Sequence, residues 1–247
     1  MYVVDGGGKI QIRHNLFVNN NERGLYCPDC PRALIRDNRA EGNGGVGMDL
    51  NADRTQVAGN LSAANGGTGI LLNPGAGSSH AKVNDNVANR NLFVGINARV
   101  NNGRIQVEGN IANENTTYGT LVSPQNGIYA SRMRRNLSVA NDIHGFLLTS
   151  ADNLRAENNI SLANGSDGYL IASTSSPGLV KNNAAIGNGD CGFEVLDHPL
   201  TIDRFFAVSN DDGRTCDTFP GEAIETGPTP SKPPALGIRR AARVVGG

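Results

Sequence analysis

The sequence is poor in the residues that build a thick globular core. Tryptophan is absent, aromatic residues make up 5% of the 247 residues, and hydrophobic residues make up 38%. No run of about 18 apolar residues occurs, which argues against a membrane-spanning helix. The N-terminus has no basic segment followed by a long apolar stretch, so we expect no signal peptide in this chain.

Charge of either sign is not in excess. The 22 Lys and Arg residues nearly balance 23 Asp and Glu residues, which gives a formal net charge of −1. Neither a nucleic-acid partner nor an anionic membrane surface is indicated, because both favour a basic excess. Glycine, in contrast, is abundant, with 32 residues. Together with many asparagines it indicates a chain that turns often and tightly.

A repeat organises these residues. The stretch from 57 to 72, VAGNLSAANGGTGILL, holds an Asn, a second Asn five residues later, a Gly four residues further on, and then an apolar run. The pattern occurs eight times between about residues 10 and 213. The first Asn is Asn15, Asn38, Asn60, Asn86, Asn110, Asn136, Asn159 and Asn183, and the second is Asn20, Asn43, Asn65, Asn91, Asn115, Asn141, Asn164 and Asn188. The Gly is Gly24, Gly47, Gly69, Gly95, Gly119, Gly145, Gly168 and Gly192, and a degenerate ninth copy keeps Asn210.

Each copy predicts three short strands separated by turns. The strand after the Gly has apolar first and third residues, which predicts two residues facing inward and one outward. A second strand ends before the first Asn, and a third lies between the two asparagines. We expect Asn or Gly to make the bends in left-handed conformation. Equivalent asparagines on successive coils are expected to stack as hydrogen-bonded ladders.

This pattern, V-x-x-N, x4, N, x3, G, resembles the right-handed parallel β-helix repeat of the pectate-lyase-like superfamily. A leucine-rich repeat shares the period, but it needs Leu where this chain has Ala33, Thr55 and Ser131, and it does not need the second Asn. We therefore predict an all-β right-handed parallel β-helix of about eight to nine coils of 22–26 residues, covering residues 1–216. Residues 217–247 are rich in Pro and Gly, finish basic, and are expected to form a flexible tail. The alternative is that this tail folds back on the solenoid.

The four cysteines are expected to form two disulfides. Cys27 and Cys30 fall in the first coil, and Cys191 and Cys216 fall near the C-terminal end. Coils stack at about 4.8 Å, so the two groups lie roughly 30 Å apart, beyond the reach of a disulfide. Cys27–Cys30 and Cys191–Cys216 remain, with free thiols at Cys27 and Cys30 as the alternative. Disulfides and the resemblance imply an extracellular or periplasmic location.

The resemblance implies a protein directed at carbohydrate, either a polysaccharide binder or a divergent lyase, epimerase or hydrolase. Sites in that superfamily commonly lie on the outer face of one sheet. The outward column of the first sheet is Tyr26, Asp49, Leu71, Asn97, Leu121, Leu147, Leu170 and Glu194. One Asp and one Glu, six coils apart with four leucines between them, argue against a catalytic cleft there. We expect the Leu71, Leu121, Leu147 and Leu170 face to contact another subunit or domain.

Two further groups of residues are candidates for function. Asp197 and His198 form an acid–histidine pair that suits general-base chemistry, although a turn is the simpler interpretation. The basic residues Arg132, Arg134, Arg155 and Lys181 are candidates for binding an anionic polysaccharide, with a solvated charged face as the alternative.

The candidates for metal binding are weak. His80 and His144 lie about three coils apart and cannot share a metal ion. No set of metal ligands is evident, and Ca²⁺ is implied only by the resemblance. The absence of a complete catalytic group also supports a second hypothesis, a non-catalytic structural or interaction scaffold.

Overall fold

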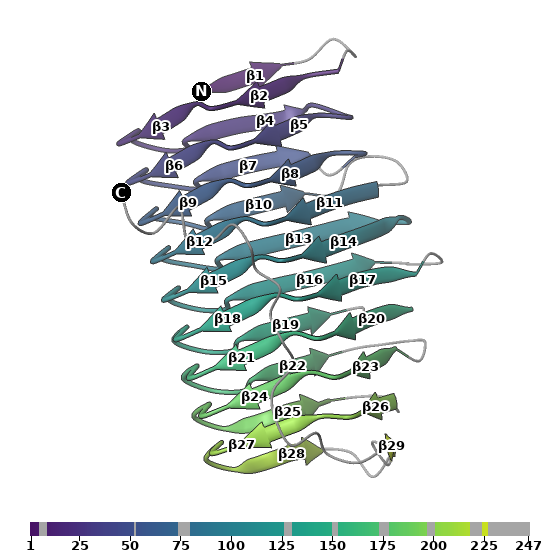
Figure 1. Ribbon diagram of the computed structural model, residues 1–247. Coiled ribbons are helices and arrows are strands. Elements are labelled where there is room, and N and C mark those ends of the chain that lie inside the picture. Colours follow the sequence, from purple (N-terminus) through teal and green to yellow (C-terminus); the bar gives the residue numbers. More distant parts are fainter. Residues whose placement is uncertain are drawn as a thin grey trace.

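The computed structural model describes residues 1–4, 9–51, 53–73, 80–125, 130–149, 153–172, 178–196, 201–217 and 224–226. Within these ranges the regular elements are all strands, which wind into a stack of coils (Figure 1). No helix in this part of the chain is long and apolar enough to cross a membrane.

Each coil contributes one strand to each of three parallel sheets. Sheet A contains β1 (Tyr2–Val4), β4 (Leu25–Asp29), β7 (Met48–Asn51), β10 (Ile70–Asn73), β13 (Ile96–Asn101), β16 (Thr120–Gln125), β19 (Phe146–Thr149), β22 (Tyr169–Ala172), β25 (Cys191–Val195) and β28 (Gly213–Asp217). Sheet B contains β2 (Gln11–Arg13), β5 (Leu34–Arg36), β8 (Gln56–Ala58), β11 (His80–Asn84), β14 (Arg104–Glu108), β17 (Ser131–Arg134), β20 (Leu154–Glu157), β23 (Leu179–Lys181), β26 (Thr201–Asp203) and β29 (Ile224–Thr226). Sheet C contains β3 (Leu16–Val18), β6 (Arg39–Glu41), β9 (Leu61–Ala63), β12 (Val87–Asn89), β15 (Ile111–Asn113), β18 (Leu137–Val139), β21 (Ile160–Leu162), β24 (Ala184–Ile186) and β27 (Phe206–Val208).

The predicted parallel β-helix is confirmed, with a slightly different coil count. Sheets A and B each have ten strands and sheet C has nine within the described ranges, against a prediction of about eight to nine coils. The additional strands are β1, which pairs with β4, and β28 and β29, which pair with β25 and β26. β29 lies beyond residue 216, where the sequence places the start of the tail.

The interior is filled by residues that alternate along each strand. In sheets A and B these are mainly aliphatic, such as Leu72 and Val83, both fully buried. In sheet C the middle residue faces inward and is small in every strand after β3, as at Ala88 and Ser138, whereas β3 has Phe17 there. Small residues there leave room for the larger side chains of sheets A and B, because a coil of three short strands encloses little volume.

Aromatic side chains replace aliphatic ones inside the last coils. Phe146, Tyr169 and Phe193 occupy the same inward position on three successive strands of sheet A. Their rings stack with centroids 4.9 and 4.2 Å apart, and Phe205 meets Phe193 edge-on. The buried hydroxyl of Tyr169 donates to the carbonyl of Ala184 at 3.2 Å, which satisfies the polar end of this apolar column.

The two Asn columns form the predicted ladders. Asn110 is typical: its Oδ1 accepts from the backbone N and the Nδ2 of Asn86, each at 3.0 Å. Its own Nδ2 donates to the carbonyl of Val83 at 2.8 Å and to Oδ1 of Asn136 at 2.9 Å. The first ladder runs through all eight predicted residues, and the second continues to Asn210. Each buried amide therefore satisfies backbone groups that the bends leave without partners.

The position of the left-handed residue differs from the prediction. The residue before each ladder Asn, and not the Asn itself, has positive φ, for example Asp85 at 54°, Gly109 at 67° and Arg135 at 55°. This residue makes the bend and points its side chain away from the interior. The following Asn then directs its amide inward along the stack.

The recurring Gly serves close packing between coils. A Cβ atom on Gly95 would lie 2.6 Å from Nδ2 of Asn115 and 2.7 Å from the carbonyl oxygen of Gly119. Such distances are too short for a real carbon atom, so a side chain here would displace the ladder. The Gly therefore allows the close approach of successive coils.

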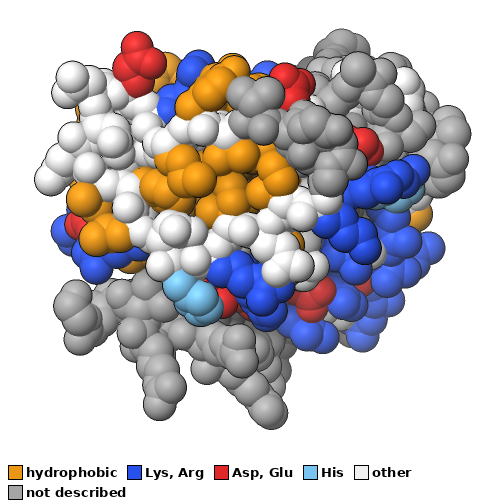
Figure 2. All heavy atoms as spheres, turned by 90° about the horizontal axis from the view of Figure 1, so that it is seen from above, with side chains coloured by type: hydrophobic (Ala, Val, Ile, Leu, Met, Phe, Trp, Pro, Cys, Tyr) orange, Lys and Arg blue, Asp and Glu red, His pale blue; other side chains and the backbone are white. Residues whose placement is uncertain are grey.

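The end of the stack that carries β1 to β3 exposes hydrophobic side chains. Figure 2 looks onto this end and shows them gathered near its centre. Apart from this central group, Tyr2 and Leu16 on the outer faces of the first strands are each 63% exposed, and Val18 is also exposed. Within the described residues, no element covers this end as a cap.

Candidate functional site

The candidate site lies on the outer face of sheet A, where two columns of side chains run along the stack. The strand column is the predicted outward one, and its members pair in register from Tyr26 to Glu194. The turn column is the residue before each recurring Gly: Arg23, Val46, Thr68, Val94, Tyr118, His144, Asp167 and Cys191. The amide of each of these glycines through Gly168 donates to the carbonyl of the turn-column residue on the next coil, which places the column in register.

The leucines of the strand column form an apolar floor. Leu121 and Leu147 are buried together with Val94, and Tyr118 and Leu170 pack against them. This cluster is separate from the interior core. The protein's own side chains thus cover much of the predicted leucine face, and a contact with another subunit or domain stays a prediction.

Tyr118, His144 and Asp167 form a row of ionisable groups beside this floor. They belong to three successive coils. The rings of Tyr118 and His144 stack with centroids 5.4 Å apart and an interplanar angle of 15°. Nδ1 of His144 lies 2.9 Å from Oδ2 of Asp167, whose side chain is 2% exposed. The other carboxylate oxygen of Asp167 accepts from the backbone N of Cys191 at 3.1 Å, which holds the carboxylate in place.

The contact with Asp167 determines how His144 carries its protons. Nδ1 of His144 also lies 3.3 Å from the backbone N of Asp167, and one nitrogen cannot donate to the carboxylate and accept from that amide at once. The shorter contact, to an anionic oxygen, is the stronger one. It assigns a proton to Nδ1 and leaves Nε2 as the basic nitrogen of the neutral ring.

Acidic groups continue the face beyond the row. Burial and the neighbouring carboxylate of Asp167, which also shares a hydrogen bond, raise the pKa of Glu194. The pKa of Asp190 is raised by burial first, and then by the charges of Asp167 and Asp212. Carboxylates that crowd together in this way hold protons more firmly than isolated ones. The face therefore combines an imidazole with carboxyl groups whose pKa is raised.

The raised pKa of Glu194 predicts a pH-dependent effect of Glu194→Gln. The folded protein binds a proton at Glu194 more firmly than the unfolded chain, so ionisation of this group costs stability as pH rises above its ordinary value of 4.5. The side-chain amide of Gln carries its own N–H groups, so it can donate a hydrogen bond to Asp167 without first binding a proton. We expect the thermal midpoint to rise by about 2–4 °C at pH 7, and to match the wild type below about pH 4.

Calorimetry of the two proteins across this pH range checks the prediction. Glu157→Gln on sheet B serves as the control, because Glu157 lies away from these carboxylates and pairs with Lys181 in the strand register. A Glu194→Gln midpoint equal to or below that of the wild type at pH 7 would contradict it.

A metal ion fits this group poorly. Asp167, Asp190 and Cys191 bring potential ligand atoms within 4.8 Å of one another. Cys191 is disulfide-bonded, so it offers no thiolate. Both oxygens of Asp167 are engaged, by His144 and by the amide of Cys191. Ca²⁺ takes six to eight oxygen ligands, and the described residues of this group do not supply such a set.

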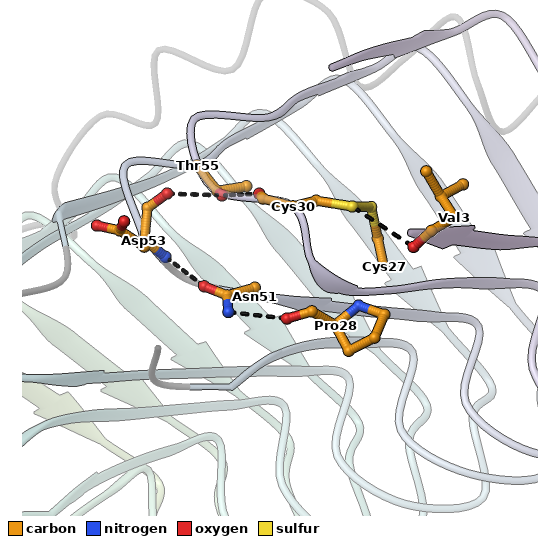
Figure 3. The surroundings of a disulfide bond; sticks show 7 residues. All are labelled: Val3, Cys27, Pro28, Cys30, Asn51, Asp53 and Thr55. Carbon is orange, nitrogen blue, oxygen red and sulfur yellow. Dashed lines mark hydrogen bonds between the residues drawn. A yellow bond between two sulfur atoms is a disulfide. The ribbon is translucent and has the colours of Figure 1, made fainter. Parts of the chain in front are cut away.

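The first pair of cysteines forms a structural disulfide. Cys27 and Cys30 are joined, with Cα atoms 5.5 Å apart, and both are buried (Figure 3). The Cys30 sulfur lies 3.8 Å from the carbonyl oxygen of Val3, and Thr55 donates to the Cys30 carbonyl at 3.4 Å. The bond joins Cys27, within β4, to Cys30, just after the end of this strand, without the helix that activates redox cysteines. The pairing of Cys191 with Cys216 stays a prediction, because the Cys216 side chain lies outside the described residues.

The other sequence candidates do not join this site. Asp197 and His198 lie outside the described residues. The basic candidates are on the outer face of sheet B, where Arg132 and Arg155 are neighbours in register. Arg134 pairs with Glu108 at 2.9 Å and Lys181 with Asp203 at 2.7 Å, so half of the set is already neutralised. Polysaccharide binding by these four residues stays a prediction.

Sequence reasoning missed the row of Tyr118, His144 and Asp167. It considered His144 only as a metal ligand, and it examined only the strand column for catalytic groups. The available signal was the position before each recurring Gly, where Tyr, His and Asp follow one another in consecutive copies. A strand residue and the residue three positions earlier lie on the same outer face because the turn intervenes between them.

Comparisons with known proteins agree with this architecture. Residues 2–112 match the family model described as "Right handed beta helix region". A search of curated protein sequences finds no match. Among solved structures, a mutant of the periplasmic alginate epimerase AlgG is 15% identical, with a TM-score of 0.58, and the match covers 81% of this chain and 51% of that one. The mannuronan C-5 epimerase AlgE4 A-module from Azotobacter vinelandii is 13% identical, with a TM-score of 0.59, over 88% of this chain and 57% of that one.

This chain thus spans about half the length of these structures. At such low identity the similarity concerns the fold alone. The parallel sheets, the Asn ladders and the family match lead to one conclusion. The chain folds as a right-handed parallel β-helix.

Proposed function

We propose that the protein acts on a uronic-acid polysaccharide, by removing the proton from the sugar carbon that bears the carboxylate. The observation that carries this proposal is the His144–Asp167 pair, stacked on Tyr118 and placed beside an apolar floor. The similarity in fold to two alginate epimerases supports the choice of substrate. It also favours a location in the periplasm or outside the cell.

In this mechanism His144 is the general base. Asp167 orients the ring and stabilises the imidazolium that forms when Nε2 accepts the proton. A proton next to a carboxylate is only weakly acidic, because the resulting carbanion adds charge beside an existing anion. The raised pKa of Glu194 and Asp190 widens the pH range over which one of them carries a proton, and a protonated carboxyl group there would donate a hydrogen bond to the sugar carboxylate and lower that cost. This role explains why carboxyl groups with raised pKa lie next to the base.

Two outcomes are open to the carbanion. Loss of the substituent at the neighbouring carbon gives an unsaturated sugar, which is β-elimination. Return of a proton to the opposite face inverts the carbon, which is epimerisation, and the Tyr118 hydroxyl is the nearest further proton carrier in the row. The fold comparisons favour epimerisation.

The test is proton exchange in deuterated water. Polymannuronate, polyguluronate and pectate are incubated with the protein, the signal of the carbon-bound proton is followed by NMR, and unsaturated ends are followed by ultraviolet absorbance. Deuterium on the carbon next to the carboxylate, without unsaturated ends, identifies an epimerase. Unsaturated ends identify a lyase, because elimination leaves no hydrogen on that carbon. A protein that produces neither deuterium incorporation nor unsaturated ends with any of these polymers would overturn the proposal.

An interaction scaffold is the second candidate, favoured by the outer face of sheet C. Its outward column carries apolar side chains on consecutive coils, including Leu61, Val87, Ile111 and Leu137. An apolar stripe of this kind is typical of contact surfaces. A protein that fails the exchange test but self-associates in light scattering, and loses this association on Ile111→Lys, would support the scaffold.

A further inference from the structure

A second group of polar and aromatic side chains lies on the outer face of sheet A, at the opposite end from the acidic groups. Nε of Arg23 contacts Oδ2 of Asp49 at 3.0 Å, and its guanidinium lies over the Tyr26 ring, 4.1 Å from the centroid. The Tyr26 ring in turn meets that of Tyr2 at 5.1 Å. Tyr2, Tyr26 and Asp49 are consecutive members of the strand column.

The contacts of the buried Asp49 side chain fix the position of this group. The Asp49 side chain is only 8% exposed, and its other oxygen accepts from Nδ2 of Asn73 at 2.8 Å. Burial raises the pKa of Asp49, while Arg23 and Asn73 act in the opposite direction. Arg23, in contrast, is 41% exposed, and both of its Nη atoms carry N–H groups outside the Nε contact. A buried carboxylate therefore orients an accessible guanidinium beside two aromatic rings.

The chemistry of this group suits a sugar that carries a carboxylate. A guanidinium with N–H groups to spare recognises a carboxylate or vicinal hydroxyls through paired hydrogen bonds. The exposed ring of Tyr2, with Tyr26 beside it, offers an apolar surface against which the C–H face of a sugar can pack. Arg23 lies five coil steps from His144 in the same column, a distance of about 24 Å.

The surface between the two groups carries no charge within these columns. From Val46 to Tyr118 in the turn column, and from Leu71 to Leu147 in the strand column, the side chains are all neutral. Beyond His144 the face becomes acidic, with Asp167, Asp190 and Glu194. Away from the reacting unit, a polyanionic chain is thus favoured on the Arg23 side of His144, where a cation lies, over the other side, where the ionisable groups of these two columns are carboxyl groups.

We propose that Arg23, Tyr26 and Tyr2 form a distal subsite that binds one uronate unit of the polysaccharide chain whose reacting unit lies at His144. This inference rests on the proposed function for its substrate class. Such a subsite makes polysaccharide binding one-sided. The polysaccharide occupies the outer face of sheet A from β4 to β19 and does not continue over the acidic groups. Chains long enough to span both groups bind more tightly than short oligomers.

Binding and turnover of a size series of oligouronates test the subsite. In the His144→Gln background, Arg23→Ala is expected to weaken polymer binding, measured by calorimetry, roughly tenfold, the equivalent of one charge-assisted hydrogen bond. The ratio of polymer affinity to short-oligomer affinity should fall by the same factor. Arg36→Ala on sheet B is the matched control, because Arg36 is 44% exposed and also faces an Asp, at 3.5 Å.

Arg23→Ala leaves the buried carboxylate of Asp49 without its cation. The double variant Arg23→Ala, Asp49→Asn removes this unpaired negative charge and provides a second test. An unchanged affinity ratio in the double variant, or an equal loss in Arg36→Ala, would overturn the subsite. Failure of the proposed function gives a different result. If polymer binding depends on Arg23 but the wild type shows no proton exchange, the subsite is retained and the proposed chemistry is rejected. If the wild type shows proton exchange but Arg23→Ala does not change polymer binding, the chemistry is retained and the subsite is rejected.

Discussion

Replacing His144 by Gln is expected to reduce turnover of a uronic-acid polysaccharide by about 10²- to 10⁴-fold, the usual contribution of a general base. Gln keeps a polar group near Asp167 but has no nitrogen that accepts a proton at neutral pH. Polymer binding should persist, because the apolar floor and the Arg23 group are unchanged. The loss should therefore appear in kcat and not in KM.

The matched control for this variant is His80→Gln. His80 is exposed on β11 of sheet B, away from the proposed site. Asp167→Asn extends the test, because it removes the anion that stabilises the imidazolium while it keeps the shape of the side chain. We expect Asp167→Asn to lower kcat as well. Full turnover in His144→Gln, with folding confirmed by circular dichroism, would eliminate His144 as the base.

Replacing Asn110 by Leu is expected to lower the free energy of unfolding by at least about 4 kcal/mol. The substitution removes four hydrogen bonds of a fully buried amide. The carbonyl of Val83 and the backbone N–H of Asn86 would lose these partners, and Nδ2 of Asn86 would keep only its bond to the carbonyl of Val57. Leu has no polar atom to replace the lost ones. Buried polar groups that lose their partners carry the full cost of desolvation.

Urea denaturation followed by circular dichroism measures this effect. Asn113→Leu in the same coil is the control, because Asn113 is only half-buried, on the outer face of sheet C, and its contacts to Asn89 and Glu114 are near the surface. We expect the control to change stability by less than about 1 kcal/mol. Similar losses in the two variants would show that the ladder adds little beyond ordinary surface contacts.

The fold was predictable from the sequence because its determinants repeat. Every coil must place an amide at the same bend and a Gly at the same close approach, so these residues recur at constant offsets. The exact left-handed residue was not predictable in the same way. The only feature shared by Asp85, Gly109 and Arg135 is a positive φ angle. Because a side chain at such a bend is exposed, many residue types are tolerated there.

The candidate site was harder to predict for the opposite reason. A repeat is detected through what its copies share, whereas the site consists of residues in which the copies differ. Equivalent positions of three copies hold side chains of different chemistry, namely Tyr118, His144 and Asp167. A search for residue types that repeat therefore does not detect them. Their meaning depends on the stacking of coils, which brings residues 23 to 26 positions apart into contact.

The Asn ladders give the stack a direction. Each Oδ1 accepts from the coil before it, and each Nδ2 donates to the Oδ1 of the coil after it. The two ends of a ladder therefore differ chemically: the longer, second ladder has the acceptor of Asn20 at one end and the donors of Asn210 at the other. Two such ends of the same kind present like groups to each other, so a twofold-symmetric, end-to-end pairing cannot continue the ladder. Only a head-to-tail, heterologous contact can do so, and this kind of contact has no intrinsic limit to its growth.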